Sequence, residues 1–164
     1  MILIKSKVIK YSCLLFFIYF IIKIIVSLNM ELNQSIKIIN NFFNITYVHN
    51  EGAAFSILTG QRYVLIFIGV ISLYMFFKYL DTFKENKRNI ITFSLLIGGV
   101  IGNLFDRVVY GHVIDFLDFK IFGYNYPIFN VADIFIFFAV IFLIVAIIKG
   151  EDYGSSSRKR RKIR

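Results

Sequence analysis

Apolar residues are gathered in this chain into four long segments, and the polar stretches between them carry most of the charge. A helix rises about 1.5 Å per residue and the hydrocarbon core of a bilayer is about 30 Å thick, so roughly 20 apolar residues can span it. The four segments approach that length: residues 11–28, 63–80, 90–107 and 133–149. We therefore expect an all-α membrane protein with four transmembrane helices in one integral domain, residues 1–164, which ends in a basic tail, 150–164.

The two longest polar connections differ in pattern. Residues 29–62 are rich in Asn, and Ile45–Asn50 has the β-branched and aromatic residues that favour strands, which predicts a small β-like segment. Residues 108–133 have the pattern of an amphipathic, aromatic connection. In the third apolar segment, Gly98 and Gly102 form a small-xxx-small pair, a pattern that lets membrane helices approach closely.

Composition supports a membrane protein over the other classes. The chain is 58% hydrophobic with 20 Phe, and its mean hydropathy is +0.71, which exceeds what a soluble core needs. The net charge of +9 could suggest nucleic acid, but the basic residues lie at the ends and between apolar runs rather than on one face. A single cysteine, Cys13, excludes an internal disulfide and a Cys-based zinc site, and we expect it to serve in packing.

The distribution of Lys and Arg predicts the topology. The N-terminus, the 81–89 connection with Lys78 and the C-terminus together hold 14 of these residues. The opposite face holds four, Lys37, Arg62, Arg107 and Lys120. The positive-inside rule then places both termini in the cytoplasm and both polar connections outside. The long first apolar run lacks a small-x-small cleavage site, so we expect an uncleaved signal anchor.

Acidic residues are scarce but clustered. Of 10 in the chain, four fall between positions 98 and 133, at the edges of apolar segments: Asp106, Asp115, Asp118 and Asp133. An ionisable side chain within a membrane costs roughly 2.5 to 3.5 kcal/mol even on lenient scales, so such residues indicate a functional site. We expect the active site in this stretch.

Asp133 stands at the start of the fourth apolar segment, in the first turn or at the N-cap of the expected helix. Its role could simply be to cap that helix. Asp115 could be a solvated loop carboxylate, but a bend at Gly123–Pro127 would bring it back beside Asp133. Two carboxylates at a partly dry interface share one proton, which supplies an acid and a base at the same pH. This is the chemistry of aspartic proteases, so peptide hydrolysis is available.

The neighbouring polar residues leave alternatives open. Asp106 and Arg107 are most simply an interfacial ion pair. Asn103 and Asn130 could orient carboxylates or backbone, or could equally form an interhelical hydrogen bond or a cap. The run Gly52-Ala53-Ala54 has the pattern of a tight turn followed by close packing.

Other chemistries find little support. His49 and His112 lack a third metal ligand at suitable spacing, and the sequence contains neither a Ser–His–Asp arrangement nor a Gly-rich phosphate motif. The rival interpretation is a non-enzymatic membrane protein, such as a transporter subunit, in which the acidic cluster binds cations. A ring of additional oxygen ligands around Asp115 and Asp133 would favour that rival.

Four short motifs around these residues resemble those of the lipoprotein signal peptidases (signal peptidase II), four-span intramembrane aspartyl proteases of bacteria. HNEGAAF is similar to the family's N-x-G-A-A-F, GGVIGNLFDR to G-G-x-x-G-N-x-x-D-R, VIDF to V-x-D-F, and FNVAD to F-N-x-A-D. The four motifs stand in the family's order between Asn50 and Asp133, so the chain is identified as a member.

The resemblance implies that Asp115 and Asp133 are the catalytic pair and that residues 29–62 form a cradle for the substrate. Supporting and substrate-contacting roles fall to Lys23, Asn50, Gly52, Asn103, Arg107 and Asn130. The family cuts prolipoproteins before a cysteine that carries diacylglycerol, uses no metal or cofactor, and is inhibited by globomycin. By resemblance we expect prolipoproteins and membrane lipids as partners, no nucleic acid, a monomer, and a site near the outer face of a bacterial plasma (inner) membrane.

The chain departs from the family pattern at two positions. The family usually has D-Q-x-x-K in its first span, and here Lys23 matches the lysine while Tyr19 stands at the aspartate position. The usual serine after the second catalytic aspartate is Ile134. We expect the first change to remove a structural partner of Lys23 and the second to remove a hydroxyl beside the site.

Overall fold

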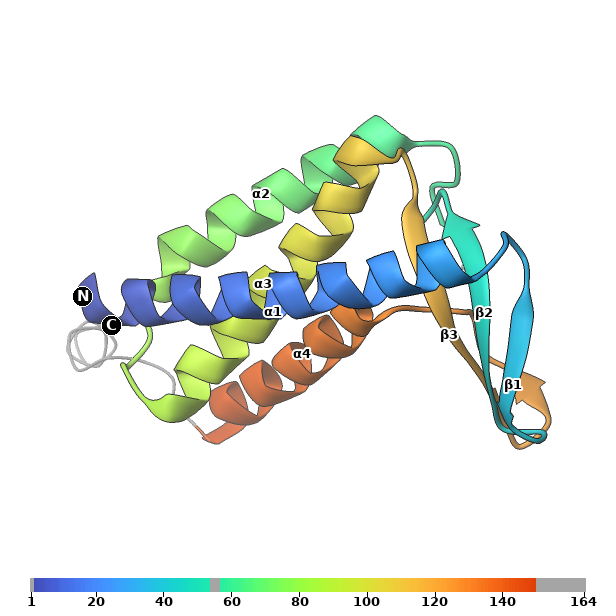
Figure 1. The fold of residues 1–164 in the computed structure, drawn as a ribbon. Helices are drawn as coiled ribbons and strands as arrows, with labels where there is room; N and C mark the ends of the chain where they lie inside the picture. Colours follow the sequence, from blue (N-terminus) through green and yellow to red (C-terminus); the bar gives the residue numbers. More distant parts are fainter. Residues whose placement is uncertain (1, 54–56, 150–164) are drawn as a thin grey trace.

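The computed structural model describes residues 2–53 and 57–149. In these residues the helices and strands follow in the order α1 (Ile2–Asn29), β1 (Ser35–Ile39), β2 (Phe43–Asn50), α2 (Arg62–Leu80), α3 (Lys87–Val109), β3 (Val113–Ile121), β4 (Tyr124–Asn125) and α4 (Val131–Lys149). Figure 1 shows the helices as a bundle with the strands gathered at one end. We call this the sheet end, and the opposite end, where α2 connects to α3, the loop end.

The four predicted spans are helices long and apolar enough to cross a membrane: Ile4–Asn29, Arg62–Leu80, Lys87–Val109 and Val131–Lys149. Large apolar side chains such as Phe17, Phe67 and Phe137 are 58%, 65% and 62% exposed on these helices. Such surfaces suit lipid rather than water, as in a multi-pass membrane protein. Cys13 is also exposed on α1, so the expectation that it serves in packing is wrong.

The expectation of an all-α protein is wrong for residues 108–133, which contain β3 and β4. These strands join β1 and β2, which confirm the predicted β-like segment, in a four-stranded sheet of order β1-β2-β3-β4. β3 is antiparallel to β2, with Val48 opposite Asp115 and Asn50 opposite Val113. Because β2, the strand with which β3 forms most of its pairs, is distant in sequence, the local pattern of β3 alone indicated only an amphipathic segment.

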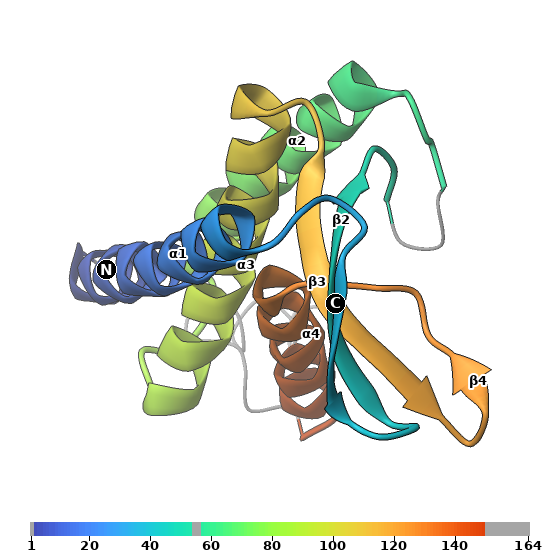
Figure 2. The same ribbon diagram turned by 45° about the vertical axis from the view of Figure 1, so that its right-hand side comes forward.

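The chain doubles back after β3, as the sequence predicted. Phe122 and Gly123 both have positive φ, 51° and 81°, which suits a two-residue hairpin whose twist matches that of its strands. The chain then returns along β3, where the Leu117 N–H donates to the Phe129 carbonyl oxygen at 2.8 Å and the Phe129 N–H donates back at 3.2 Å. This return places the start of α4 next to β3 (Figure 2).

Helix α3 contacts the other three helices, and its glycines allow close approach. A Cβ on Gly98 would lie 3.1 Å from Leu15 of α1, and one on Gly102 would overlap an aromatic ring of the same helix. The predicted small-xxx-small pair thus faces α1. A Cβ on Gly99 would lie 2.7 Å from the backbone oxygen of Ala132, so Gly99 sets how closely α4 approaches.

At the loop end, the basic start of the chain is part of α1 rather than a segment before it. Lys5 pairs with Asp81 at 2.7 Å and Lys7 with Glu85 at 2.8 Å, so α1 is tied to the α2–α3 connection. The first residues of α1, the α2–α3 connection and the last turn of α4 lie away from the sheet (Figure 1). The helices therefore separate the sheet from these basic segments.

We predict that Gly99→Ala destabilises the protein by about 1–3 kcal/mol, because the added methyl group would overlap the Ala132 backbone and the Ile136 side chain. Thermal denaturation in detergent measures this. Gly69→Ala is the matched control, since its Cβ would meet only the flexible end of Leu104, at 3.3 Å. Equal melting temperatures for the two variants would contradict the proposed close contact between α3 and α4.

Candidate active site

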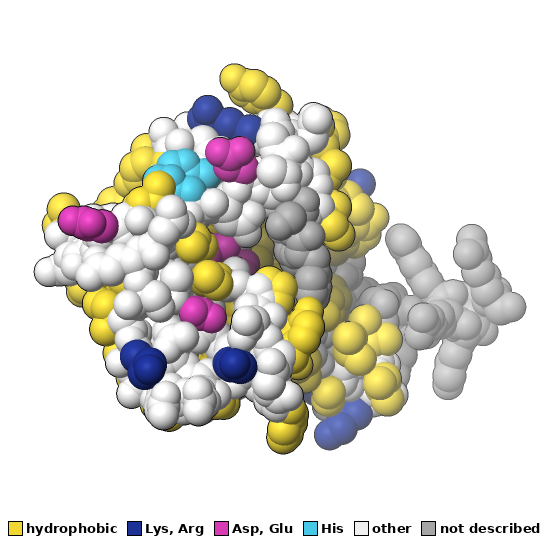
Figure 3. Space-filling view, turned by 90° about the vertical axis from the view of Figure 1, so that its right-hand side faces the viewer, with side chains coloured by type: hydrophobic (Ala, Val, Ile, Leu, Met, Phe, Trp, Pro, Cys, Tyr) yellow, Lys and Arg dark blue, Asp and Glu magenta, His cyan; other side chains and the backbone are white. Residues whose placement is uncertain are grey.

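A cavity of about 650 Å³ opens where the sheet meets α3 and α4. Its polar lining includes Asn50, Asn103, Arg107, Asp115 and Asp133. Figure 3 views the sheet end and shows acidic side chains recessed in a hollow on this face. The fold thus brings residues from β2, β3, α3 and α4 to one site.

Asp115 lies on β3 and is only 2% exposed. On β2, Asn50 lies two residues beyond the residue that pairs with Asp115. The side chains of Asn50 and Asp115 therefore lie on the same face of the sheet. The Asn50 amide donates to one Asp115 oxygen at 2.8 Å, and the Asn130 amide donates to the other at 2.6 Å. Asp115 is therefore a buried strand carboxylate with a donor on each oxygen, not a solvated loop residue.

Asn130 and Asp133 together cap the start of α4. The Asn130 Oδ1 accepts from the backbone N–H of Ala132 at 2.7 Å and of Asp133 at 3.3 Å. In return, the Asp133 Oδ2 accepts from the Asn130 N–H at 3.0 Å. This is the reciprocal pattern of a capping box, which satisfies N–H groups that a helix start leaves without partners. The capping alternatives for both residues are correct, and both side chains also reach the cavity network.

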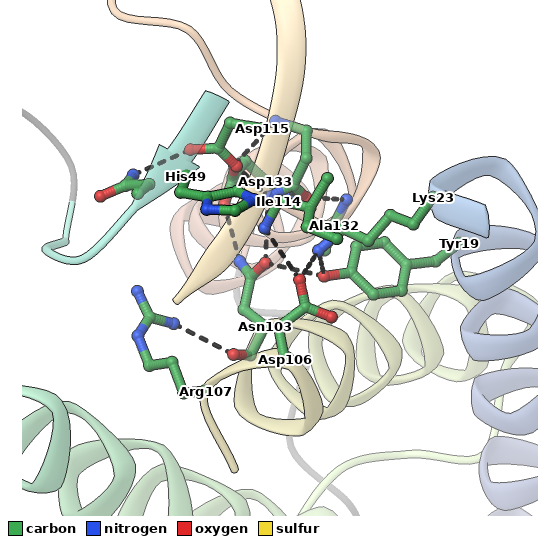
Figure 4. A network of polar contacts seen from close by, with 12 residues as sticks. Tyr19, Lys23, His49, Asn103, Asp106, Arg107, Ile114, Asp115, Ala132 and Asp133 are labelled. Atoms are coloured by element: carbon green, nitrogen blue, oxygen red, sulfur yellow. Dashed lines mark hydrogen bonds and ion pairs between the residues drawn. The ribbon is translucent and has the colours of Figure 1, made fainter. Parts of the chain in front are cut away.

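Asn103 connects α3 to the same cluster. Its Nδ2 donates to Asp133 Oδ1 at 2.8 Å, and its Oδ1 accepts from Asn130 Nδ2 at 3.1 Å. The Asn130 amide therefore donates to both Asp115 and Asn103, and each carboxylate oxygen of Asp115 and Asp133 receives an N–H. Figure 4 shows the two carboxylates close together, with Asn103 and Asp106 below them. The bond from Asn103 to Asp133 orients a carboxylate and also joins α3 to α4, so the structure supports both of these alternatives for Asn103.

The loop after β2 is tied to α3 through Arg107. Asn50 Oδ1 accepts the Gly52 N–H at 2.9 Å, and the Gly52 carbonyl oxygen accepts from Arg107 Nη2 at 2.7 Å. Arg107 also donates from Nη1 to the Asn103 carbonyl oxygen at 3.2 Å. The turn predicted at Gly52-Ala53-Ala54 is present over its first two residues, and Ala54 lies outside the described residues.

Asp106 has a different partner from the one the sequence suggested. It is fully buried and forms an ion pair with Lys23 of α1, whereas Arg107 contacts backbone oxygens instead. The Asp106 Oδ2 also accepts the Ile114 N–H at 3.0 Å, beside Asp115. The expected Asp106–Arg107 pair is thus wrong, and so is the expectation that Lys23 lacks a structural partner. The pair holds α1, α3 and the start of β3 together.

Tyr19 belongs to this network, although sequence reasoning treated it only as a departure from the family pattern. Its hydroxyl accepts from Lys23 Nζ and donates to Asn103 Oδ1 at 3.3 Å. The signal that could have found it is its i, i+4 spacing from Lys23 on one helix face. Asp118, by contrast, accepts from Thr46 at 2.7 Å and Asn44 at 3.3 Å, within the sheet.

His49 lines the cavity, and the ring of His112 stacks on it with centroids 3.6 Å apart. The Tyr47 hydroxyl is 2.9 Å from His49 Nε2. Burial lowers the pKa of both imidazoles, and for His112 the nearby His49 lowers it further. Among residues 2–53 and 57–149, no group of three His, Cys, Asp or Glu side chains is arranged to hold a metal ion.

The electrostatics of the cavity favour proton exchange near neutral pH. Burial, and after it the charge of Asp133, raises the pKa of the Asp115 carboxyl from 3.8 to about 6, although the Asn130 and Asn50 amides oppose the shift. Two carboxylates in one partly dry cavity cannot ionise independently. The pair can therefore hold one proton and provide an acid and a base together.

The fold and the site define a multi-pass membrane protein with two carboxylates, a buried Asp115 and a partly buried Asp133, in one cavity at one end of its helix bundle. The family described as "Signal peptidase (SPase) II" matches residues 11–149, and the chain belongs to this family. It is therefore a peptidase of lipoprotein processing, and the family cleaves the signal peptides of prolipoproteins.

Individual relatives agree with this assignment. The chain is 41% identical over 133 residues to a lipoprotein signal peptidase of Staphylococcus haemolyticus, covering 77% of this chain and 81% of the relative. It is 37% identical over 145 residues to a lipoprotein signal peptidase of Staphylococcus aureus, covering 87% and 85%. A solved bacterial membrane enzyme superposes with a TM-score of 0.80 at 35% identity, with 88% of each chain covered.

Because the pKa of Asp115 is raised in the folded protein, the stability of the protein should depend on pH. A carboxyl whose pKa is higher in the folded state stabilises the fold below about pH 4, and this contribution is lost as the pH rises through about 6. The melting temperature of the parent in detergent should therefore fall relative to that of Asp115→Asn between about pH 4 and 7. Asp118→Asn, on the same strand, should follow the parent. Parallel curves for the parent and Asp115→Asn would contradict the shift.

Proposed function

We propose that this peptidase hydrolyses the bond before the diacylglyceryl-modified cysteine of prolipoproteins, with Asp115 and Asp133 as an aspartyl pair. The observation that carries this proposal is that both carboxylates line one cavity and are joined through Asn130. Apolar residues such as Val48, Val113 and Phe129 share that lining and suit a lipid-linked, apolar substrate.

In the proposed reaction, Asp133 accepts a proton from a water molecule while the water oxygen attacks the scissile carbonyl carbon. Asp115 then donates its proton to the leaving nitrogen, the C–N bond breaks, and the products are a signal-peptide carboxyl group and a cysteine amine. The proton taken from water stays on the pair, which again holds one. The raised pKa of Asp115 suits the acid, and the position of Asp133 in the first turn of α4 suits the ionised base.

The rival function, cation binding, is less compatible with the donors around the carboxylates. The oxygens of Asp115 and Asp133 accept N–H groups from Asn50, Asn103 and Asn130. A hard cation prefers a shell of oxygen ligands and would compete with these donors for the same lone pairs. The donors instead hold the carboxylates in fixed orientations, which suits acid–base chemistry.

The sheet end lies at the outer face of the bacterial plasma membrane, with both termini cytoplasmic, because the basic segments lie away from the sheet. A site at that depth suits a substrate held by its lipid and its own signal helix. By family resemblance, globomycin inhibits the enzyme. One chain supplies both carboxylates and their donors, so a monomer has a complete site.

We predict that Asp115→Asn and Asp133→Asn each lower cleavage of a lipidated prolipoprotein by about a thousandfold or more, because an amide can neither share the proton nor act as a base. Cleavage by purified protein in detergent or vesicles measures this. Residues that act as a unit are not additive, so the double variant should be scarcely worse than either single one.

Asp118→Asn is the matched control for this experiment. Asp118 lies on the same strand as Asp115, but it accepts hydrogen bonds from Asn44 and Thr46 within the sheet. It should keep most of the parent's activity. Substantial cleavage by Asp115→Asn or Asp133→Asn alone would refute the aspartyl mechanism. An equal loss of activity in Asp118→Asn would mean that Asp115 is misassigned as one of the catalytic pair.

Topology can be tested separately. Reporters fused at either terminus or near Glu85 should show a cytoplasmic location, and one inserted near Asn40 should show an external one, since the excess of basic residues orients the helices. A cytoplasmic result at Asn40 would place the cavity in the wrong compartment for this substrate.

A further inference from the structure

Tyr19 is a buried tyrosine at the junction of two polar networks. Its side chain is 1% exposed and its ring packs against α3 at Gly102, where a Cβ would lie 2.8 Å from the ring. Its hydroxyl lies between the Lys23 ammonium and the Asn103 amide (Figure 4). On one side of this hydroxyl is the Lys23–Asp106 ion pair, and on the other is the network of the two carboxylates.

The chemistry of these groups fixes the direction of each hydrogen bond. A lysine ammonium has only donors, so the Tyr19 oxygen must accept from Lys23. The single phenolic hydrogen is then free to point to Asn103, whose near atom must be the amide oxygen. The Asn103 NH₂ group is thereby left facing Asp133, to which it donates at 2.8 Å. A directed chain thus runs from Lys23 through Tyr19 and Asn103 to Asp133.

We propose that Tyr19 is a positioning residue for hydrolysis, whose hydroxyl holds the Asn103 amide with its NH₂ group toward Asp133. The inference rests on the proposed function of Asp133 as the base. Tyr19 does not line the site cavity, so it acts through Asn103 rather than on the substrate. The Asn130 amide also donates to Asn103 Oδ1, at 3.1 Å, so loss of the Tyr19 hydroxyl weakens the orientation of Asn103 without abolishing it.

Removal of the hydroxyl would change which atom Asn103 presents to Asp133. An Asn103 amide that rotates would present its oxygen to Asp133, and two acceptors facing each other repel. Asp133 would then lose one of the donors that orient its carboxylate. In Tyr19→Phe we therefore expect kcat to fall about tenfold and KM to stay the same.

Tyr19→Phe keeps the ring against Gly102 and removes only the hydroxyl, so the helix packing is preserved. Tyr11→Phe is the matched control, because Tyr11 lies on the same helix and is 46% exposed. It should leave both kcat and KM unchanged. An unchanged kcat in Tyr19→Phe would overturn the inference, and so would an increase in KM with kcat unaltered.

A second measurement does not depend on cleavage. In protein labelled with ¹⁵N at Asn, the Asn103 side-chain amide signals can be assigned by their loss in Asn103→Ala. Tyr19→Phe should shift or broaden these signals, whereas Tyr11→Phe should not, and unmoved signals would overturn the inference. Failure of the parent to cleave a lipidated prolipoprotein would instead refute the proposed function, and the amide signals would still decide the role of Tyr19.

Discussion

The side-chain amide of Asn130 is the group on which the geometry of this site depends. Its oxygen caps α4, while its nitrogen donates to Asp115 on β3 and to Asn103 on α3. A buried carboxylate without donors would lose several kcal/mol of solvation, and each hydrogen bond to a charged group returns about 1.5–3 kcal/mol. One amide therefore stabilises a helix start and orients two other elements toward the same cavity.

Around this amide, rigid elements rather than long loops hold the reacting groups. The β2–β3 register sets Asn50 beside Asp115, the first turn of α4 sets Asp133, and the centre of the bundle sets Asn103 on α3. Glycines on α3 allow α1 and α4 to pack close enough to α3 for these side chains to meet. Precise placement of this kind is the main requirement for acid–base catalysis, because a reacting group displaced by about 1 Å loses much of its effect.

The ion pair of Lys23 with Asp106 extends the same network to α1. Both groups are almost fully buried, and such pairs contribute specificity of arrangement more reliably than net stability. Here the pair joins α1 and α3 and also holds the backbone at Ile114, the residue before Asp115. Tyr19 then links the pair to Asn103. A position at which the chain departs from the usual family pattern is thus fully integrated into the site.

The sequence by itself determined the four membrane helices, the polar segment with strands between the first two, the family, and the candidate carboxylates. These features rest on hydropathy, local spacing and short motifs, all of which are properties of neighbouring residues. Only the tertiary structure decided that residues 108–133 supply two strands, that Asp106 pairs with Lys23 rather than Arg107, and that Tyr19 contacts Asn103. Each of these depends on groups far apart in the chain, and a buried polar side chain takes whichever partner the packing of helices and sheet brings within reach.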